Sequence, residues 1–247
     1  MRPRVVPALA LSLACVIAAG LSLAPAARGE HHGGPPVGSL LSCDRPVNPP
    51  RCVSVGNDRW HYVYIDPSVP AALADAVRRA ISDYDSTALV VREQERLTIV
   101  TDVIVSAADH GANGAAGWVY CPSQARQGVN AQGDRWCQHQ ELHFNLNPRY
   151  AAYFADNASR DYMACHEMGH SIGLRHWGNP PRSDGPAAAT CMQPDAPDGP
   201  RTLHQFDREH LDTYYRPSRG APVEPVVFWL RHLRAASYLV SHLAGDA

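Results

Sequence analysis

Apolar and polar positions alternate with two different periods along the middle of the chain. Between residues 70 and 88 apolar residues recur every three or four positions, which predicts an amphipathic helix. Segments rich in aromatic and β-branched residues predict strands at 60–65 and at 97–105, the second either kinked or split in two. Further strands are predicted at 117–120 and 141–146. The order strand, helix, strand favours a right-handed crossover within a mostly parallel sheet.

Both ends of the chain depart from this pattern. An apolar run at 5–23 follows Arg2 and Arg4 and precedes small residues at 24–26, which predicts a signal peptide covering residues 1–27. The alternative, a membrane anchor, is disfavoured because Pro7 and Gly20 interrupt the run. Residues 28–57 are predicted to form an irregular arm or a short propeptide. Residues 218–247 are predicted to form a linker and an amphipathic helix, which docks on the domain, a membrane surface or a partner.

Composition narrows the class of protein. The sequence has 247 residues and a net charge of -2, which argues against nucleic acid as a partner. It contains no lysine and is rich in Ala and Pro, which suggests a bacterial genome of high GC content. We therefore expect a secreted bacterial protein with one folded domain at 58–217. We expect it to be a monomer without membrane association once the signal peptide is removed.

The cysteines point to disulfide bonds. The chain has seven, and removal of the signal peptide takes Cys15 away. An even number in an exported protein implies disulfides, although the spacing alone allows many pairings. The simplest pairing is the sequential one: Cys43–Cys52, Cys121–Cys137 and Cys165–Cys191.

Candidate chemistry is concentrated in one stretch that contains His166, Glu167, His170, Gly173 and His176 in the order HExxHxxGxxH. Two histidines four positions apart on a helix share a face and can reach one metal ion. The glutamate is rotated by about 100° from its neighbour, so it can hold a water beside that metal. The glycine permits a left-handed turn that returns the third histidine to the site. Three histidines and an open position are typical of a catalytic zinc site.

The stretch resembles the extended zinc-binding motif of the metzincin peptidases at every fixed position. Met192, within Ala-Thr-Cys-Met-Gln-Pro, resembles their second signature, a methionine in a tight turn beneath the metal. Pro194 resembles the matrixin subgroup, and the absence of a tyrosine at that position departs from the astacin type. The resemblance covers 59–217. It implies an α+β, zincin-like fold with a twisted, mostly parallel sheet, an active-site helix at 159–173, a Met-turn and a C-terminal helix.

The resemblance also implies a chemistry, that of a zinc endopeptidase. Zn²⁺ would be held by His166, His170 and His176, with Glu167 as general base and protein or peptide substrates extended along the strand at 117–120. In this fold the turn that carries Met192 lies under the metal helix. Because Cys165 and Cys191 directly precede the first histidine and the methionine, the two could then form a bond.

Two other functions stay open. One is a secreted binding or inhibitory protein on a zincin scaffold, against which the intact Glu167 argues, and the other is a zinc hydrolase of a non-peptide amide. A calcium site is a further option because Asp102, Asp109 and Asn113 offer oxygen ligands, with an ordinary polar loop as the alternative. His139 and His143 are four apart, but on a predicted strand that spacing is too long for a shared metal.

Overall fold

The computed structural model describes residues 54–130, 133–176, 190–194 and 199–216. All of them belong to one compact unit of the chain, Gly33–Ala247. The predicted signal peptide, most of the predicted arm, the pair Cys43–Cys52, the loop at 177–189 and the predicted C-terminal helix lie outside the described residues. No helix in the described part is both long and apolar enough to cross a membrane.

A five-stranded sheet with the order β2-β1-β3-β7-β4 forms one layer of the fold. All neighbours in it are parallel except β4, which runs antiparallel to β7. Its strands are β1 (Trp60–Ile65), β2 (Val90–Gln94), β3 (Val103–Ala108), β4 (Gly117–Tyr120) and β7 (Gln140–Asn145). A separate antiparallel pair is formed by β5 (Arg126–Val129) and β6 (Arg135–Gln138). The mostly parallel sheet confirms the prediction and is compatible with a zincin-like fold.

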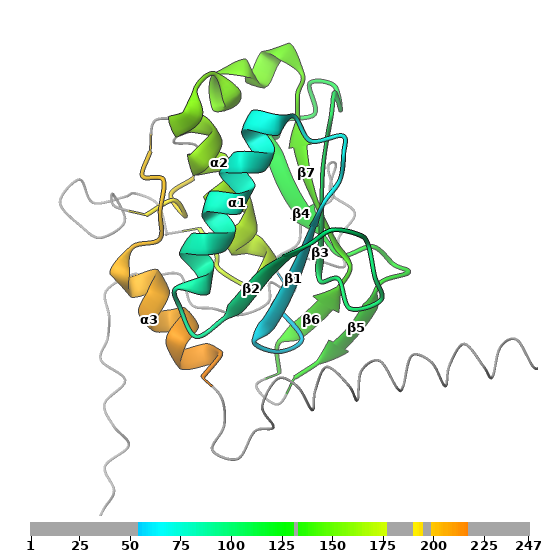
Figure 1. Ribbon diagram of the computed structural model, residues 1–247, viewed down its shortest axis with the longest axis vertical. Helices are drawn as coiled ribbons and strands as arrows, with labels where there is room; N and C mark the ends of the chain where they lie inside the picture. Colours follow the sequence, from blue (N-terminus) through cyan, green and yellow to red (C-terminus); the bar gives the residue numbers. More distant parts are fainter. Residues whose placement is uncertain (1–53, 131–132, 177–189, 195–198, 217–247) are drawn as a thin grey trace, which may run out of the picture. The chain divides into compact units, whose positions relative to one another are not determined.

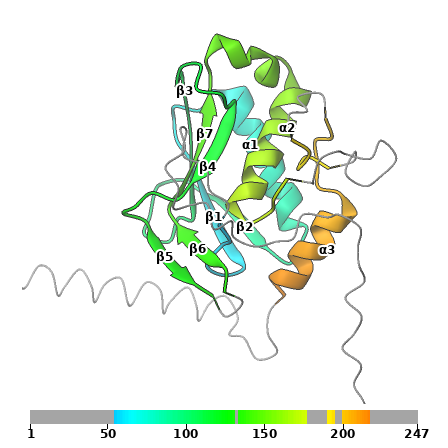
Figure 2. The ribbon, with the colours of Figure 1, turned by 180° about the vertical axis from the view of Figure 1, so that it is seen from behind.

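Two helices, α1 (Ala71–Asp85) and α2 (Asn157–Ser171), lie side by side against the sheet (Figures 1 and 2). A 3-10 helix η2 (Pro148–Phe154) precedes α2, and α3 (Gln205–Tyr214) ends the described domain. The core joins alternate strand residues such as Val63, Val103 and Leu142 to the apolar face of α1. Burial of this continuous apolar surface is what holds the two layers together.

The strand predicted at 97–105 is wrong in its first half. There Thr98 and Thr101 close a turn, in which the Thr98 amide donates to Thr101 Oγ1 at 2.9 Å and the Thr101 amide to the Thr98 carbonyl at 3.1 Å. The strand β3 begins only at Val103. The strand β2 was not predicted, because only its first two residues are apolar and its pairing is made by the backbone.

The three oxygen-bearing residues considered for calcium do not come together. Asp102 lies just before β3 and Asp109 just after it, so the length of the strand separates them. Asp102 is fully buried and accepts from the Tyr62 amide at 2.8 Å. Asp109 accepts from the Gly111 amide and from Asn147, while Asn113 accepts from Asn145. The bonds of Asp109 and Asn113 are those of an ordinary polar loop, whereas Asp102 lies in the interior.

Disulfide bonds join Cys121 to Cys137 and Cys165 to Cys191. They are two of the three pairs proposed from the sequence. The first bond fastens the start of the segment that carries β5 to the strand β6. Two such bonds are consistent with folding in an oxidising compartment.

Candidate metal centre

The helix α2 has clear signals at both ends. It begins at Asn157, two residues before the start suggested by the sequence, and the side chain of the preceding Asp156 accepts from the Ser159 amide at 2.8 Å. It ends at Ser171. Gly173 then adopts φ of 95°, and the Leu174 amide donates back to the Gly169 carbonyl at 2.9 Å. The left-handed glycine thus ends the helix and turns the chain.

This turn brings three histidines together. The Nε2 atoms of His166 and His170 are 3.2 Å apart. That of His176 lies 2.9 Å from His166 and 3.0 Å from His170. Among the described residues they are the group of metal-ligating side chains that could hold an ion. His166 is buried at the floor of this group, whereas His176 is exposed.

Backbone carbonyls orient two of the rings. His166 Nδ1 lies 2.7 Å from the Cys191 carbonyl, and His170 Nδ1 lies 2.8 Å from the Leu174 carbonyl. Because a carbonyl only accepts, each Nδ1 carries the proton and each Nε2 keeps its lone pair. Two lone pairs facing each other repel unless a cation lies between them. The donor set therefore fits a metal ion, and neutral imidazoles at an exposed opening suit zinc.

Burial keeps His166 in the form that binds metal. Desolvation is the main cause that lowers the pKa of His166 to about 3, and the nearby His176 adds to it. The bond to the Cys191 carbonyl opposes the shift but is weaker. The ring is accordingly neutral at neutral pH.

Glu167 follows the first histidine on α2 and is 4% exposed. Its side chain lies against Gly117 at the start of β4, the end strand of the described sheet. The carboxylate therefore lies at the start of β4, a strand that pairs only with β7 among the described residues. The sequence predicted its place beside the metal but not its contact with β4.

Met192 packs under α2. It is fully buried, and a Cβ added at Gly169 would lie 2.3 Å from its Sδ atom. Gly169 directly precedes His170, so the methionine lies beneath the turn of the helix that carries this histidine. The Tyr84 hydroxyl fixes the same region from α1, because it donates to the Cys165 carbonyl at 2.8 Å and lies 3.9 Å from the Met192 sulfur.

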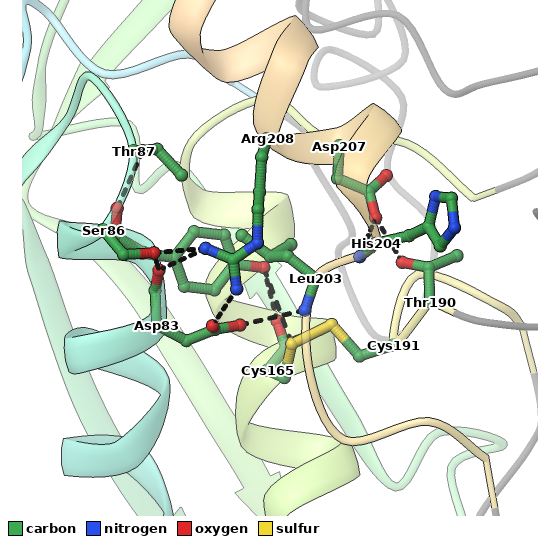
Figure 3. Close-up of polar contacts among 11 residues, drawn as sticks. Asp83, Ser86, Thr87, Cys165, Thr190, Cys191, Leu203, His204, Asp207 and Arg208 are labelled. Carbon is green, nitrogen blue, oxygen red and sulfur yellow. Dashed lines mark hydrogen bonds and ion pairs between the residues drawn. A yellow bond between two sulfur atoms is a disulfide. The ribbon is translucent and has the colours of Figure 1, made fainter.

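The turn that carries Met192 is anchored on two sides, as Figure 3 shows. On one side the Cys165–Cys191 bond ties it to α2. On the other, Thr190 Oγ1 donates to the buried Asp207 carboxylate of α3, which also accepts from the His204 amide at 3.0 Å. A C-terminal helix was predicted from the sequence, but the link between Asp207 and Thr190 was not, since nothing local signals it.

His139 and His143 stay apart from the metal-ligating group. His139 has φ of 65° at the bend between β6 and β7, and its Nε2 lies 3.0 Å from the Thr98 carbonyl. His143 Nδ1 lies 2.8 Å from Ser106 Oγ and its Nε2 lies 3.0 Å from Glu141. Its ring stacks with Trp118, so it serves as part of the sheet's polar and aromatic outer face.

The Cys165–Cys191 bond should matter for stability and for the site. We expect the double variant Cys165→Ser/Cys191→Ser to lose about 3.5 kcal/mol of unfolding free energy, the chain entropy of a loop of this length. Urea unfolding measures this loss. The matched control, Cys121→Ser/Cys137→Ser, should lose about 3 kcal/mol but keep full metal affinity. The first variant should bind zinc more weakly, because the same turn supplies the carbonyl that orients His166. Equal zinc affinities in both variants would contradict this.

Fold and site together define a mixed α/β protein with a three-histidine group able to hold a metal ion. No family model matches the chain, and no curated protein matches it. Among solved structures it is similar to the crystal structure of myroilysin, with a TM-score of 0.41 and 10% identity over 66% of this chain and 86% of that one. At such a distance, assignment of a function rests on the site itself.

Proposed function

We propose that the protein is a secreted zinc-dependent endopeptidase of the metzincin type. The observation that carries the proposal is the convergence of three histidine Nε2 atoms within 3.2 Å of one another. Glu167 follows the first of them and lies beside β4, whose second edge has no partner strand in the described part of the chain. The matrixin-like subtype rests on the sequence alone, on the proline that follows the Met192 turn. Action as a monomer outside the cell also stays a prediction.

The three histidines and Glu167 would have different roles in peptide hydrolysis. A zinc ion held by His166, His170 and His176 would lower the pKa of a water molecule and polarise the scissile carbonyl. Glu167 takes the proton of the attacking water at a carboxylate oxygen and delivers it to the nitrogen of the leaving amine. The buried carbonyl partners of His166 and His170 hold both rings in the orientation that this arrangement needs.

The strand β4 supports a peptide as the substrate. The Asn145 amide donates to the Ala116 carbonyl at 2.8 Å, so Ala116 and every second residue after it in β4 face β7 with their amide and carbonyl groups. The residues between them, Gly117 and Val119, point their amide and carbonyl groups away from β7, towards the other edge of the strand. An extended peptide can add there as a further strand, next to Glu167. A small non-peptide amide would leave these groups unused.

Protease assays test the proposal directly. We expect the purified protein to degrade casein, a chelator to abolish the cleavage, and added Zn²⁺ to restore it. The protein should be prepared as the secreted form with its N-terminus sequenced, because an uncut arm could cover the site. A serine protease inhibitor should have no effect, which controls for contaminants. Absence of chelator-sensitive cleavage would favour a binding protein, and cleavage of small amides alone would favour the non-peptide hydrolase.

A further inference from the structure

We infer that Gly117 is a positioning residue for Glu167, because its missing side chain leaves the space in which that carboxylate lies. A Cβ added at Gly117 would meet the glutamate side chain at 2.8 Å from Oε1, 2.9 Å from Cγ and 3.0 Å from Cδ. Contacts of a Cβ with another heavy atom below 3.0 Å are essentially never seen in proteins. A residue with any side chain at 117 therefore moves the glutamate.

Backbone conformation does not explain this glycine. Four glycines of the described chain have positive φ, namely Gly111, Gly114, Gly133 and Gly173, and Gly117 is not among them. An alanine could adopt its extended conformation, and a glycine inside a strand costs stability relative to other residues. The remaining reason for a glycine at this place in β4 is that it leaves room for the side chain of Glu167.

Glu167 has little freedom to give way. It is 4% exposed, and α2 is held in place by the Cys165–Cys191 bond and by Met192 beneath it. The short contacts include Cγ, whose position follows from the first side-chain torsion. Rotation of the carboxylate alone would not relieve them. The side chain would have to change its rotamer, which carries the carboxylate away from its place beside the histidines.

If the protein is the proposed peptidase, Gly117 also sets how the bound peptide lies relative to Glu167; this step rests on the proposed function. Its amide and carbonyl face the open edge of β4, where a peptide would pair, while its Cβ position faces the base. One residue thus sets the separation between the bound backbone and the carboxylate. An added methyl group would keep the pairing groups and displace the base, so kcat should fall while KM changes little.

A stability cycle tests the contact without any metal or activity. The variants Gly117→Ala, Glu167→Ala and the double variant are compared with the wild type as metal-free proteins by urea unfolding. We expect Gly117→Ala to destabilise the wild-type background but not the Glu167→Ala background, because that truncation removes Cγ, Cδ and Oε1. If Gly117→Ala does not fold alone, folding of the double variant supports the inference and its failure to fold overturns it.

A control variant comes from the same strand. Tyr120→Phe removes a hydroxyl that donates to Glu141, away from the glutamate of α2, so its cost should be the same in both backgrounds. Equal costs of Gly117→Ala in the two backgrounds would overturn the inference. The zinc-loaded Gly117→Ala protein should keep its zinc and lose about 10- to 100-fold in kcat on a peptide substrate.

The two readouts separate the inference from the proposed function. A wild type without chelator-sensitive cleavage, together with a non-additive stability cycle, would refute the peptidase and leave the role of Gly117 in placing Glu167 intact. An active wild type with an additive cycle, and with kcat of Gly117→Ala unchanged, would refute the role of Gly117 and leave the peptidase.

Discussion

Replacing Glu167 by glutamine should lower kcat/KM for peptide cleavage by about 10²- to 10⁴-fold while zinc stays bound, which is the usual contribution of a general base. Glutamine has the same shape, so it fits the space beside Gly117 and leaves the three histidines where they are. It cannot accept a proton from the attacking water at neutral pH. The loss should therefore appear in kcat, with KM nearly unchanged.

Three measurements settle the role of Glu167. Peptide cleavage gives kcat and KM, metal analysis gives the zinc content, and urea unfolding shows that the variant is folded. Glu95→Gln is a suitable control, since it makes the same charge change at an exposed position in the turn after β2. Near-native turnover of zinc-loaded Glu167→Gln would remove the glutamate from the mechanism. Loss of zinc in the variant would instead make it a determinant of metal binding.

The parts of the site that depend on helical spacing were predictable from sequence. His166 and His170 face one side because they are one helical turn apart, and Gly173 returns the chain because only glycine enters a left-handed turn at little cost. Both features depend only on residues close together in the chain, so they can be predicted from the sequence. The same holds for α1 and for β1, whose apolar patterns are strong and uninterrupted.

The contacts between distant elements were not predictable. Glu167 and Gly117 lie on α2 and β4, and nothing near either residue signals that they touch. Thr190 and Asp207 likewise meet only after the turn and α3 have packed together. The strand β2 escaped detection for a related reason, because its partner β1 stabilises it through backbone bonds that are indifferent to side-chain type.

Buried ionisable groups near the C-terminal end of α2 were also hidden from the sequence. His61 on β1 is fully buried, and its Nε2 lies 3.2 Å from Ser171 Oγ, the last residue of α2. Asp102 is fully buried before β3, where one oxygen accepts from the Tyr62 amide and the other has no hydrogen-bond partner. From the sequence, this aspartate was considered as a calcium ligand or as part of a polar loop, whereas the structure places it in the interior.

Burial raises the pKa of Asp102 and lowers the pKa of His61. Desolvation raises the pKa of Asp102 from its ordinary 3.8 to about 8, against the weaker effect of the Tyr62 amide. Desolvation lowers the pKa of His61 from 6.5 to about 3. Both groups are thus uncharged in the folded protein at intermediate pH, as expected for ionisable side chains removed from water.

These shifts set the pH dependence of stability. Between pH 4 and 8 the folded state holds a proton on Asp102 that the unfolded state has released, so the stability falls as the pH rises, by about 1.4 kcal/mol per pH unit. Between pH 3 and 6.5 the unfolded state holds a proton on His61 that the folded state lacks, so the stability rises with pH at a similar rate. The slopes from Asp102 and His61 cancel between about pH 4 and 6.5, and His166, whose pKa burial also lowers to about 3, adds a further rise with pH in the metal-free protein. Above pH 6.5 only the decline from Asp102 remains.

Asp102→Asn should remove this decline. The amide oxygen still accepts from the Tyr62 amide, but the side chain no longer ionises, so the stability of the variant relative to wild type should grow by about 5 kcal/mol from pH 4 to pH 8. Taking the difference between the two proteins cancels the contributions of His61 and of the three histidines His166, His170 and His176, which both proteins share. Urea unfolding at several pH values measures it. Asp109→Asn is the control, because a surface carboxyl whose pKa is lowered by bonds from Asn147 and Gly111 should give a flat difference over this range. A flat difference for Asp102→Asn as well would mean that the aspartate is ionised in the folded protein, and the interior near the end of α2 would then have to hold a charge.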